Sequence, residues 1–291
     1  MSSTECIVLD FDGTFTRVDD EAVPFVAGFR EGLRARVGEI ADTRWDALAS
    51  RVEADPDHHG WEYDGIIVAP SHADPYIMTT TIAQLLLDEL GMTVGARTEI
   101  LQALYRENYP KSRNVFRNDA RRVVEAVLSS GVPVFVVTNS QTEHVEAKLR
   151  ELDPRGLERL SVRGDARKFV IAEPERSLGT GGGHAWRELW SEVPEKAEIS
   201  GLSRPMHLRR GHYFDALTKI WDETRTRPEN TLVCGDIFEL DLALPARLGA
   251  RVHLVARPQT PEHERRAART TPGGSVSQEL VGLLERLALP G

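Results

Sequence analysis

Two acidic residues near the start of the chain have the types and spacing needed for metal binding or nucleophilic chemistry. Asp10 and Asp12 follow the apolar run of residues 6–9 and precede Gly13, which permits a turn. A short continuous apolar run is typical of a buried parallel strand, and open α/β sheets bind ligands at the carboxyl ends of such strands. Two close carboxylates resist ionising together unless a cation neutralises them, and all-oxygen ligation suits Mg²⁺. The opening segment therefore predicts an acidic metal site.

The same design, an apolar strand that ends in a polar side chain, occurs twice more. Residues 133–137 form an apolar run followed by Thr138 and Asn139, and residues 231–235 lead to Asp236, with Asp241 five residues later. If these strands are parallel neighbours, their polar ends meet along one edge of the sheet.

The elements around these strands predict an α/β core. We expect helices at residues 120–130, 142–152, 212–221 and 242–248, a strand or strand pair at 160–171, a strand at 251–255 and a closing helix after Val276. The tail between residue 258 and Val276 is polar and carries no predicted element. The predicted fold class is a Rossmann-like parallel sheet sandwiched by helices, joined to a mainly α-helical cap domain.

Three sequence regions define the predicted domains. Residues 1–15 and 116–291 carry the α/β core, whereas residues 16–115 show helical periodicity without a βα alternation, as in Phe25, Phe29 and Leu33. Residues 172–205 form an insertion in the core. The glycine-rich run at 179–183 is predicted to be a loop, because no apolar strand precedes it and its spacing fits no phosphate-binding motif.

Composition excludes several classes of protein. The chain has 291 residues with 41% hydrophobic content and a formal net charge of −9, which disfavours a sequence-independent nucleic-acid binder. Cys6 and Cys234 lie inside apolar runs and are expected to be buried free thiols. Apolar stretches are shorter than the roughly 20 residues that span a bilayer, and four residues between Met1 and the first strand leave no room for a signal peptide. We expect a cytoplasmic protein without a membrane partner; the sequence leaves its oligomeric state open.

The motifs resemble those of the haloacid dehalogenase-like (HAD) superfamily. Residues 10–14, Asp-Phe-Asp-Gly-Thr, match its first motif D-x-D-x-T, and residues 235–241 match its fourth, G-D-x-x-x-x-D, at every defined position. Between them lies an apolar strand that ends in Thr138, the expected second motif. These three segments lie in the family's order.

The resemblance implies a catalytic role for several side chains. Asp10 would attack phosphorus and form an aspartyl-phosphate, while Asp12 would protonate the leaving oxygen and then activate water. Thr138 would hydrogen-bond a phosphoryl oxygen, and backbone N–H groups near Asn139 could add further donors to bind substrate.

The resemblance also implies a set of ligands for Mg²⁺. Asp10, the backbone carbonyl of Asp12 and Asp236 would hold the ion, and Asp241 would position the metal shell. A helical module placed directly after the first motif resembles the family's cap, which by analogy closes over the core and selects the leaving group.

The third motif, a lysine in the family, is where this sequence departs from the pattern. Lys168 follows Gly164 and Asp165 near a predicted strand and is the first candidate. Arg210 is the competitor, because it directly precedes the helix that leads to the Asp236 strand, and its guanidinium could bind phosphate. Lys148 and Lys219 are predicted to lie on helix surfaces.

These features predict a Mg²⁺-dependent phosphohydrolase that acts on a small phosphorylated metabolite through an aspartyl-phosphate. A phosphomutase of the same superfamily and a non-catalytic HAD-like binding or scaffold protein remain the alternatives. A dehalogenase is disfavoured, because its chemistry does not need the second acid, Asp12.

Overall fold

The computed structural model describes residues 4–63, 65–175 and 183–289. By its internal contacts the chain divides into two compact units, residues 1–16 with 116–291 and residues 17–115. We call them the core unit and the helical unit. Among the described residues, no helix is both long and apolar enough to cross a bilayer.

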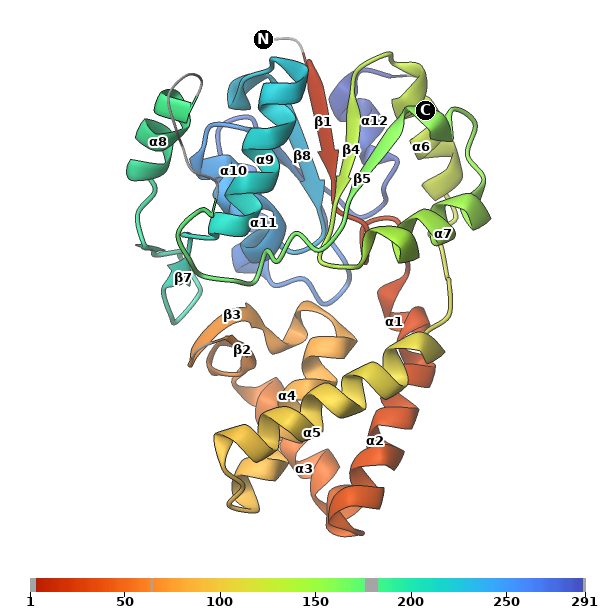
Figure 1. The fold of residues 1–291 in the computed structure, drawn as a ribbon, viewed down its shortest axis with the longest axis vertical. Helices are drawn as coiled ribbons and strands as arrows, with labels where there is room; N and C mark the ends of the chain where they lie inside the picture. The colour runs from red at the N-terminus through yellow and green to blue at the C-terminus, as the bar shows by residue number, and fades with distance from the viewer. Residues whose placement is uncertain (1–3, 64, 176–182, 290–291) are drawn as a thin grey trace. The chain divides into compact units, whose positions relative to one another are not determined.

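A six-stranded parallel sheet forms the centre of the core unit, in the order β10-β9-β8-β1-β4-β5 (Figure 1). Its strands are β1 (Cys6–Leu9), β4 (Val134–Val137), β5 (Leu160–Arg163), β8 (Thr231–Gly235), β9 (Arg251–Val255) and β10 (Ser275–Ser277). The helices of this unit are α6 (Ala120–Ser129), α7 (Thr142–Leu152), α8 (Gly183–Ser191), α9 (Gly211–Thr224), α10 (Ala243–Arg247), α11 (Glu262–Thr270) and α12 (Gly282–Leu287).

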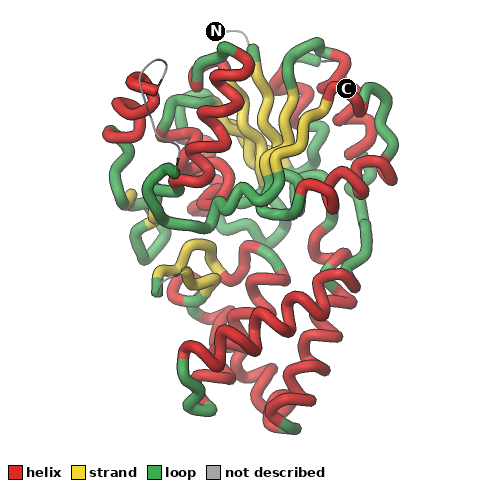
Figure 2. The backbone as a smooth tube through the Cα atoms, viewed as in Figure 1, coloured by secondary structure: helices red, strands yellow, loops and turns green. Residues whose placement is uncertain are grey.

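Helices cover both faces of the sheet, as the tube drawing in Figure 2 shows. Cys6 and Val8 of β1 pack into an apolar cluster with residues of α9, α10 and α11, whereas Ile7 and Leu9 pack into a second cluster with residues of α6, α7 and α12. Because successive strand side chains point to opposite faces, a strand buried on both sides must be apolar throughout. This explains the continuous apolar runs, and the predicted α/β fold class is confirmed.

The strand register brings the three polar strand ends together. Leu9 of β1 lies opposite Cys234 of β8 on one side and Val136 of β4 on the other. The residues that follow these strands, Asp10, Asp236 and Thr138, therefore leave the same edge of the sheet.

Two segments of the core unit differ from the sequence prediction. The predicted strand or strand pair at 160–171 is only β5, because the chain leaves the sheet after Arg163 and residues 164–171 form a loop. The polar tail contains α11 and β10, which were missed. In α11 the buried side chains are Glu264 and Ala268, so the helix has no run of large apolar residues to reveal it.

The insertion joins the core unit through aromatic side chains. An aromatic segment of the insertion forms α8, and a two-stranded ribbon of β6 (Lys196–Ala197) and β7 (Met206–His207) follows it. Trp190 donates a hydrogen bond to Glu173 at 2.7 Å, and its ring packs against Phe214 of α9. Residues 179–182 of the glycine-rich run lie outside the described residues.

The helical unit has a core of its own. Its helices are α1 (Val18–Glu21), α2 (Val23–Val37), α3 (Ile40–Ala54), α4 (Pro75–Glu89) and α5 (Val94–Asn108), and its hairpin pairs β2 (Gly60–Tyr63) with β3 (Ile66–Pro70). Phe25, Phe29 and Leu33, spaced four residues apart on α2, are fully buried. Asp74 begins α4 by accepting a hydrogen bond from the Ile77 amide at 2.7 Å.

Candidate active site

Three carboxylates from two strand ends form a buried cluster in the core unit. Asp10, Asp236 and Asp241 each offer an oxygen within 4.8 Å of the others. Their exposed fractions are 9%, 2% and 3%, which is unusual for acids unless a cation accompanies them. The predicted meeting of Asp10 with Asp236 at one edge of the sheet is therefore observed.

Two glycines permit the close approach of these acids. Gly13 has φ +80°, and a Cβ atom added to it would collide with the carboxylate of Asp236. A Cβ atom at Gly235 would collide with the side chain of Asp241. A residue with a Cβ atom therefore does not fit at either glycine of the two acidic motifs. At position 13 the positive φ also favours glycine.

A π-helical turn, η6 (Phe238–Leu242), carries Asp241 back toward Asp236. The Asp241 carboxylate accepts a hydrogen bond from the Ile237 amide at 3.0 Å, and its backbone carbonyl accepts one from the Tyr213 hydroxyl at 2.8 Å. Turns of this kind occur often at functional sites because the extra residue redirects a side chain. Hydrogen bonds to both the side chain and the backbone of Asp241 therefore hold this residue in place.

Lys168 lies against the acid cluster. Its ammonium group is 2.7 Å from Asp10 Oδ1 and 2.8 Å from Asp241 Oδ1, and only 1% of the side chain is exposed. Its Nζ is also 5.3 Å from the centroid of the Tyr213 ring. A buried ammonium group between two carboxylates bridges the first acidic motif and the last.

The loop that carries Lys168 is tied to the end of β4. Asp165 and Arg167 adopt φ values of +52° and +45°, a conformation that non-glycine residues rarely take. The Lys168 amide donates to Asn139 Oδ1 at 2.7 Å, and the Ala166 amide donates to the carbonyl of Thr138 at 2.9 Å. Asn139, predicted to lie near substrate, therefore also supports the loop of the lysine.

Arg210, the alternative to Lys168, supports the site from behind. It is fully buried, and its Nη1 donates to the backbone carbonyl of Lys168 at 2.7 Å. It also donates to the His207 carbonyl at 3.2 Å and lies 3.5 Å from Glu239 of η6. Arg204 holds Glu239 through two bonds of 3.0 and 2.7 Å. Of the two candidates, Lys168 is therefore the residue that contacts Asp10. Arg210 instead lies between the loop that carries Lys168 and η6.

Asp12 occupies a different environment from the other acids. Its Oδ2 accepts a hydrogen bond from Ser140 at 2.7 Å and a longer one from Thr138 at 3.5 Å, while its Oδ1 is 3.4 Å from the ammonium group of Lys148. Its side chain is 29% exposed, more than that of Asp10. The two acids of the first motif are thus held by different partners.

Three contributors to the site were not found from the sequence. Lys148 is 4% exposed, so its prediction as a surface residue is wrong. It lies three residues after Val145 and four before Leu152, both buried, so its helical spacing already placed it on the inner face of α7. Ser140 and Arg257, whose Nε is 3.0 Å from Asp236 Oδ2, had no motif to identify them.

Burial and charge change the protonation of the cluster. Burial, together with the negative charge of Asp241, raises the pKa of Asp10 to about 7, although Lys168 opposes this shift. Burial by itself would lower the pKa of Lys168, but Asp10 and Asp241 overcome it and raise that pKa above its ordinary value. The lysine therefore stays charged, whereas Asp10 is poised to exchange a proton near neutral pH.

The residues present fit a divalent cation. The cluster offers carboxylate oxygens alone, the donors that hard ions such as Mg²⁺ prefer over nitrogen or sulfur. Burial and, after it, repulsion from Asp241 raise the pKa of Asp10, and a bound cation would offset both effects. Thr14 donates a hydrogen bond to Asp10 Oδ2 at 3.2 Å and so ties the loop of the first motif to that carboxylate.

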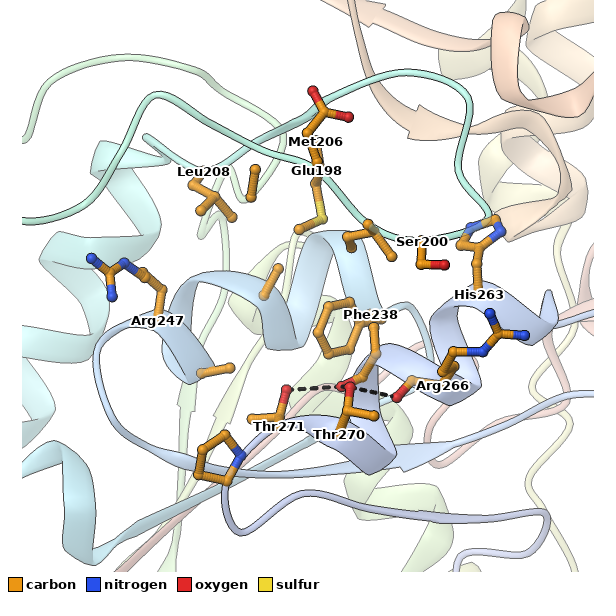
Figure 3. Close-up of a pocket in the computed structure, with 16 residues that line it drawn as sticks. Glu198, Ser200, Met206, Leu208, Phe238, Arg247, His263, Arg266, Thr270 and Thr271 are labelled. Atoms are coloured by element: carbon orange, nitrogen blue, oxygen red, sulfur yellow. Dashed lines mark hydrogen bonds between the residues drawn. The ribbon is translucent and has the colours of Figure 1, made fainter.

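A separate cavity of about 360 Å³ lies elsewhere in the core unit, between the insertion and α11 (Figure 3). Its lining includes Met206, Leu208 and Phe238, with Arg247 and His263 among the polar side chains. The clustered acids are not among its lining residues, so it is distinct from the candidate active site.

Solved structures resemble this chain along its whole length. A haloacid dehalogenase-like hydrolase from Bacteroides fragilis superposes with a TM-score of 0.51 and 13% identity, covering 96% of this chain and 99% of that one. A predicted phosphoglycolate phosphatase from Haemophilus somnus gives a TM-score of 0.52 and 11% identity, with 98% of each chain covered. A haloacid dehalogenase-like family hydrolase from Xanthomonas campestris gives 0.50 and 11%, with 99% of this chain and 96% of that one covered.

The sheet and the acids at its carboxyl edge define an α/β protein of the open-sheet type with an acidic site at the strand ends. Its fold is the haloacid dehalogenase-like fold, as the sequence resemblance predicted. No family model matches the sequence, and no curated protein matches it either.

Proposed function

We propose that this protein is a Mg²⁺-dependent phosphohydrolase that acts on a small phosphorylated metabolite. The observation that carries the proposal is the buried triad of Asp10, Asp236 and Asp241 with the Lys168 ammonium group between two of its members. Phosphoryl transfer spreads negative charge over the peripheral oxygens, so the chemistry needs fixed cations and donors around one nucleophile.

In the first step, an oxygen of Asp10 attacks phosphorus. The bond from phosphorus to the leaving oxygen breaks, an aspartyl-phosphate forms, and Asp12 gives its proton to the leaving oxygen. Ser140 and Lys148 hold Asp12 apart from the nucleophile, which supports separate roles for the two acids.

In the second step, water attacks the aspartyl-phosphate. Asp12, now a carboxylate, takes a proton from the water, the bond between phosphorus and Asp10 breaks, and inorganic phosphate leaves. Lys168 restrains the Asp10 carboxylate in both steps. Thr138 follows β4 at the same edge and is the candidate donor to a phosphoryl oxygen.

A divalent cation would be held by Asp10, Asp236 and the backbone carbonyl of Asp12, with Asp241 orienting the shell. When bound, Mg²⁺ neutralises the repulsion between nucleophile and phosphate and stabilises the charge of the transition state. Arg257 beside Asp236 keeps that carboxylate in place.

The experiment is phosphate release from para-nitrophenyl phosphate and from a panel of phosphorylated metabolites. We expect wild-type protein to release phosphate with Mg²⁺, chelator to stop release, and Asp10→Asn to abolish it while the circular dichroism spectrum is retained. Turnover by Asp10→Asn at the wild-type rate would remove Asp10 from its role, and indifference to chelator would refute the metal assignment. Phosphate moved within a sugar, with none released to water, would point to a phosphomutase.

A further inference from the structure

We propose that Lys148 is a positioning residue that holds the Asp12 carboxylate in place for proton transfer to the leaving group. The proposal rests on the proposed function, because it deepens the role of Asp12 in that reaction. The first observation is the burial of Lys148: it is 4% exposed on α7, and its Nζ is 3.4 Å from Asp12 Oδ1.

The ammonium group of Lys148 lies near two residues of the first motif, Phe11 and Asp12. Its ammonium group lies 5.6 Å from the centroid of the Phe11 ring, the residue that separates the two acids of the first motif. A lysine is rarely buried without an anionic partner, because its ammonium group loses hydration. The carboxylate of Asp12, the second acid of the motif, is therefore an anionic partner of this buried ammonium group.

Asp12 is held at both of its carboxylate oxygens. Lys148 contacts Oδ1, while Ser140 donates to Oδ2 at 2.7 Å. Ser140 follows β4 and Lys148 lies on α7, the helix that comes next in the chain. Contacts on both oxygens restrict rotation of the carboxylate about its Cβ–Cγ bond more than a contact on one oxygen would.

The orientation of Asp12 should affect the reaction rate most for substrates whose leaving oxygen must be protonated. In the first step the proton leaves the Asp12 carboxyl group for the leaving oxygen as its bond to phosphorus breaks. An alkoxide leaving group needs that proton, whereas para-nitrophenolate departs with little assistance. Loss of positioning should therefore slow the hydrolysis of alkyl phosphates more than that of aryl phosphates.

The experiment compares Lys148→Met with Lys219→Met, a matched change of an exposed lysine on α9. For each protein, kcat and KM are measured with para-nitrophenyl phosphate, phenyl phosphate and a set of alkyl phosphates, together with inhibition by inorganic phosphate. For Lys148→Met we expect kcat/KM, which reports the steps up to departure of the leaving group, to fall at least about tenfold more on alkyl phosphates than on para-nitrophenyl phosphate, within the usual contribution of a general acid. The inhibition constant of phosphate should stay at its wild-type value, and Lys219→Met should match wild type throughout.

Two results would overturn the proposal. An equal loss of kcat/KM on all leaving groups would mean that Lys148 does not position Asp12 for protonation of the leaving oxygen, and a large rise in the inhibition constant of phosphate would make it a direct phosphate ligand instead. If Lys148→Met does not fold, Ser140→Ala carries the same leaving-group test from the other carboxylate oxygen, and an unchanged dependence there would overturn the proposal as well.

Failure of the proposed function has a different signature. Wild-type protein that releases no phosphate from any member of the panel would refute the phosphohydrolase, and the role of Lys148 would fall with it. Wild-type protein that turns over, with variants that keep its leaving-group dependence, would refute the role of Lys148 alone.

Discussion

Replacing Lys168 by methionine should destabilise the core unit and make its stability depend more steeply on pH. The ammonium group of Lys168 pairs with Asp10 at 2.7 Å and with Asp241 at 2.8 Å, where all three side chains are nearly inaccessible. Removing one partner of a buried ion pair typically costs about 3–5 kcal/mol, because the charge left behind has neither water nor a counterion. For a unit of this size that loss corresponds to a fall in Tm of roughly 10 °C.

The pKa of Asp10 sets the direction of the pH dependence. Because it is raised from 3.8 to about 7 in the folded protein, Asp10 takes up a proton on folding between these values, and the associated stability is lost as pH rises through about 7. At pH 5 the protonated Asp10 repels Asp241 less, so Lys168 has less charge to neutralise. The destabilisation by Lys168→Met should therefore be smaller at pH 5 than at pH 8.5.

The assay is urea denaturation followed by circular dichroism at both pH values, with chelator present so that no metal replaces the lost charge. Lys219→Met, an exposed lysine, is the matched control and should change the free energy of unfolding by less than about 0.5 kcal/mol. Destabilisation no greater than that of the control, or greater at pH 5 than at pH 8.5, would refute the reasoning.

Three further changes test the geometry of the cluster. Gly13→Ala should lower stability and metal affinity more than Gly249→Ala, because both positions have positive φ but only the first meets a neighbouring carboxylate; equal effects in thermal unfolding would contradict this. Asp236→Asn should abolish the rise in Tm that Mg²⁺ gives the wild-type protein, whereas Glu158→Gln, an exposed change, should keep it. Arg204→Met, which frees η6 from its bidentate contact, should weaken Mg²⁺ binding by about 10–100-fold in calorimetry, and wild-type affinity would show that the contact does not support the site.

The sequence by itself determined the fold class and the acids of the candidate site. Strands buried on both faces must be apolar along their length. Short apolar runs in the sequence therefore predict β1, β4 and β8, and the polar residues that follow these runs are the candidate site residues. Because parallel strands end at one edge, the sequence pattern by itself predicts that Asp10 and Asp236 lie close together. Gly13 and Gly235, which adjoin these acids, could also be read from the sequence, whereas the physical reason for them, the space taken by a facing carboxylate, could not.

Only the tertiary structure decided which cations accompany these acids. Lys168 and Asp10 are 158 positions apart in the chain, and the direction of Lys168 depends on a loop with positive φ at Asp165 and Arg167, which no periodicity reveals. Helical spacing places Lys148 on the inner face of α7, but its contact with Asp12 depends on how that helix packs on the sheet, and Arg257 belongs to none of the motifs. Apolar patterns are local and can be read along the chain, whereas the pairing of a long, flexible cationic side chain with an acid is settled only when distant segments pack.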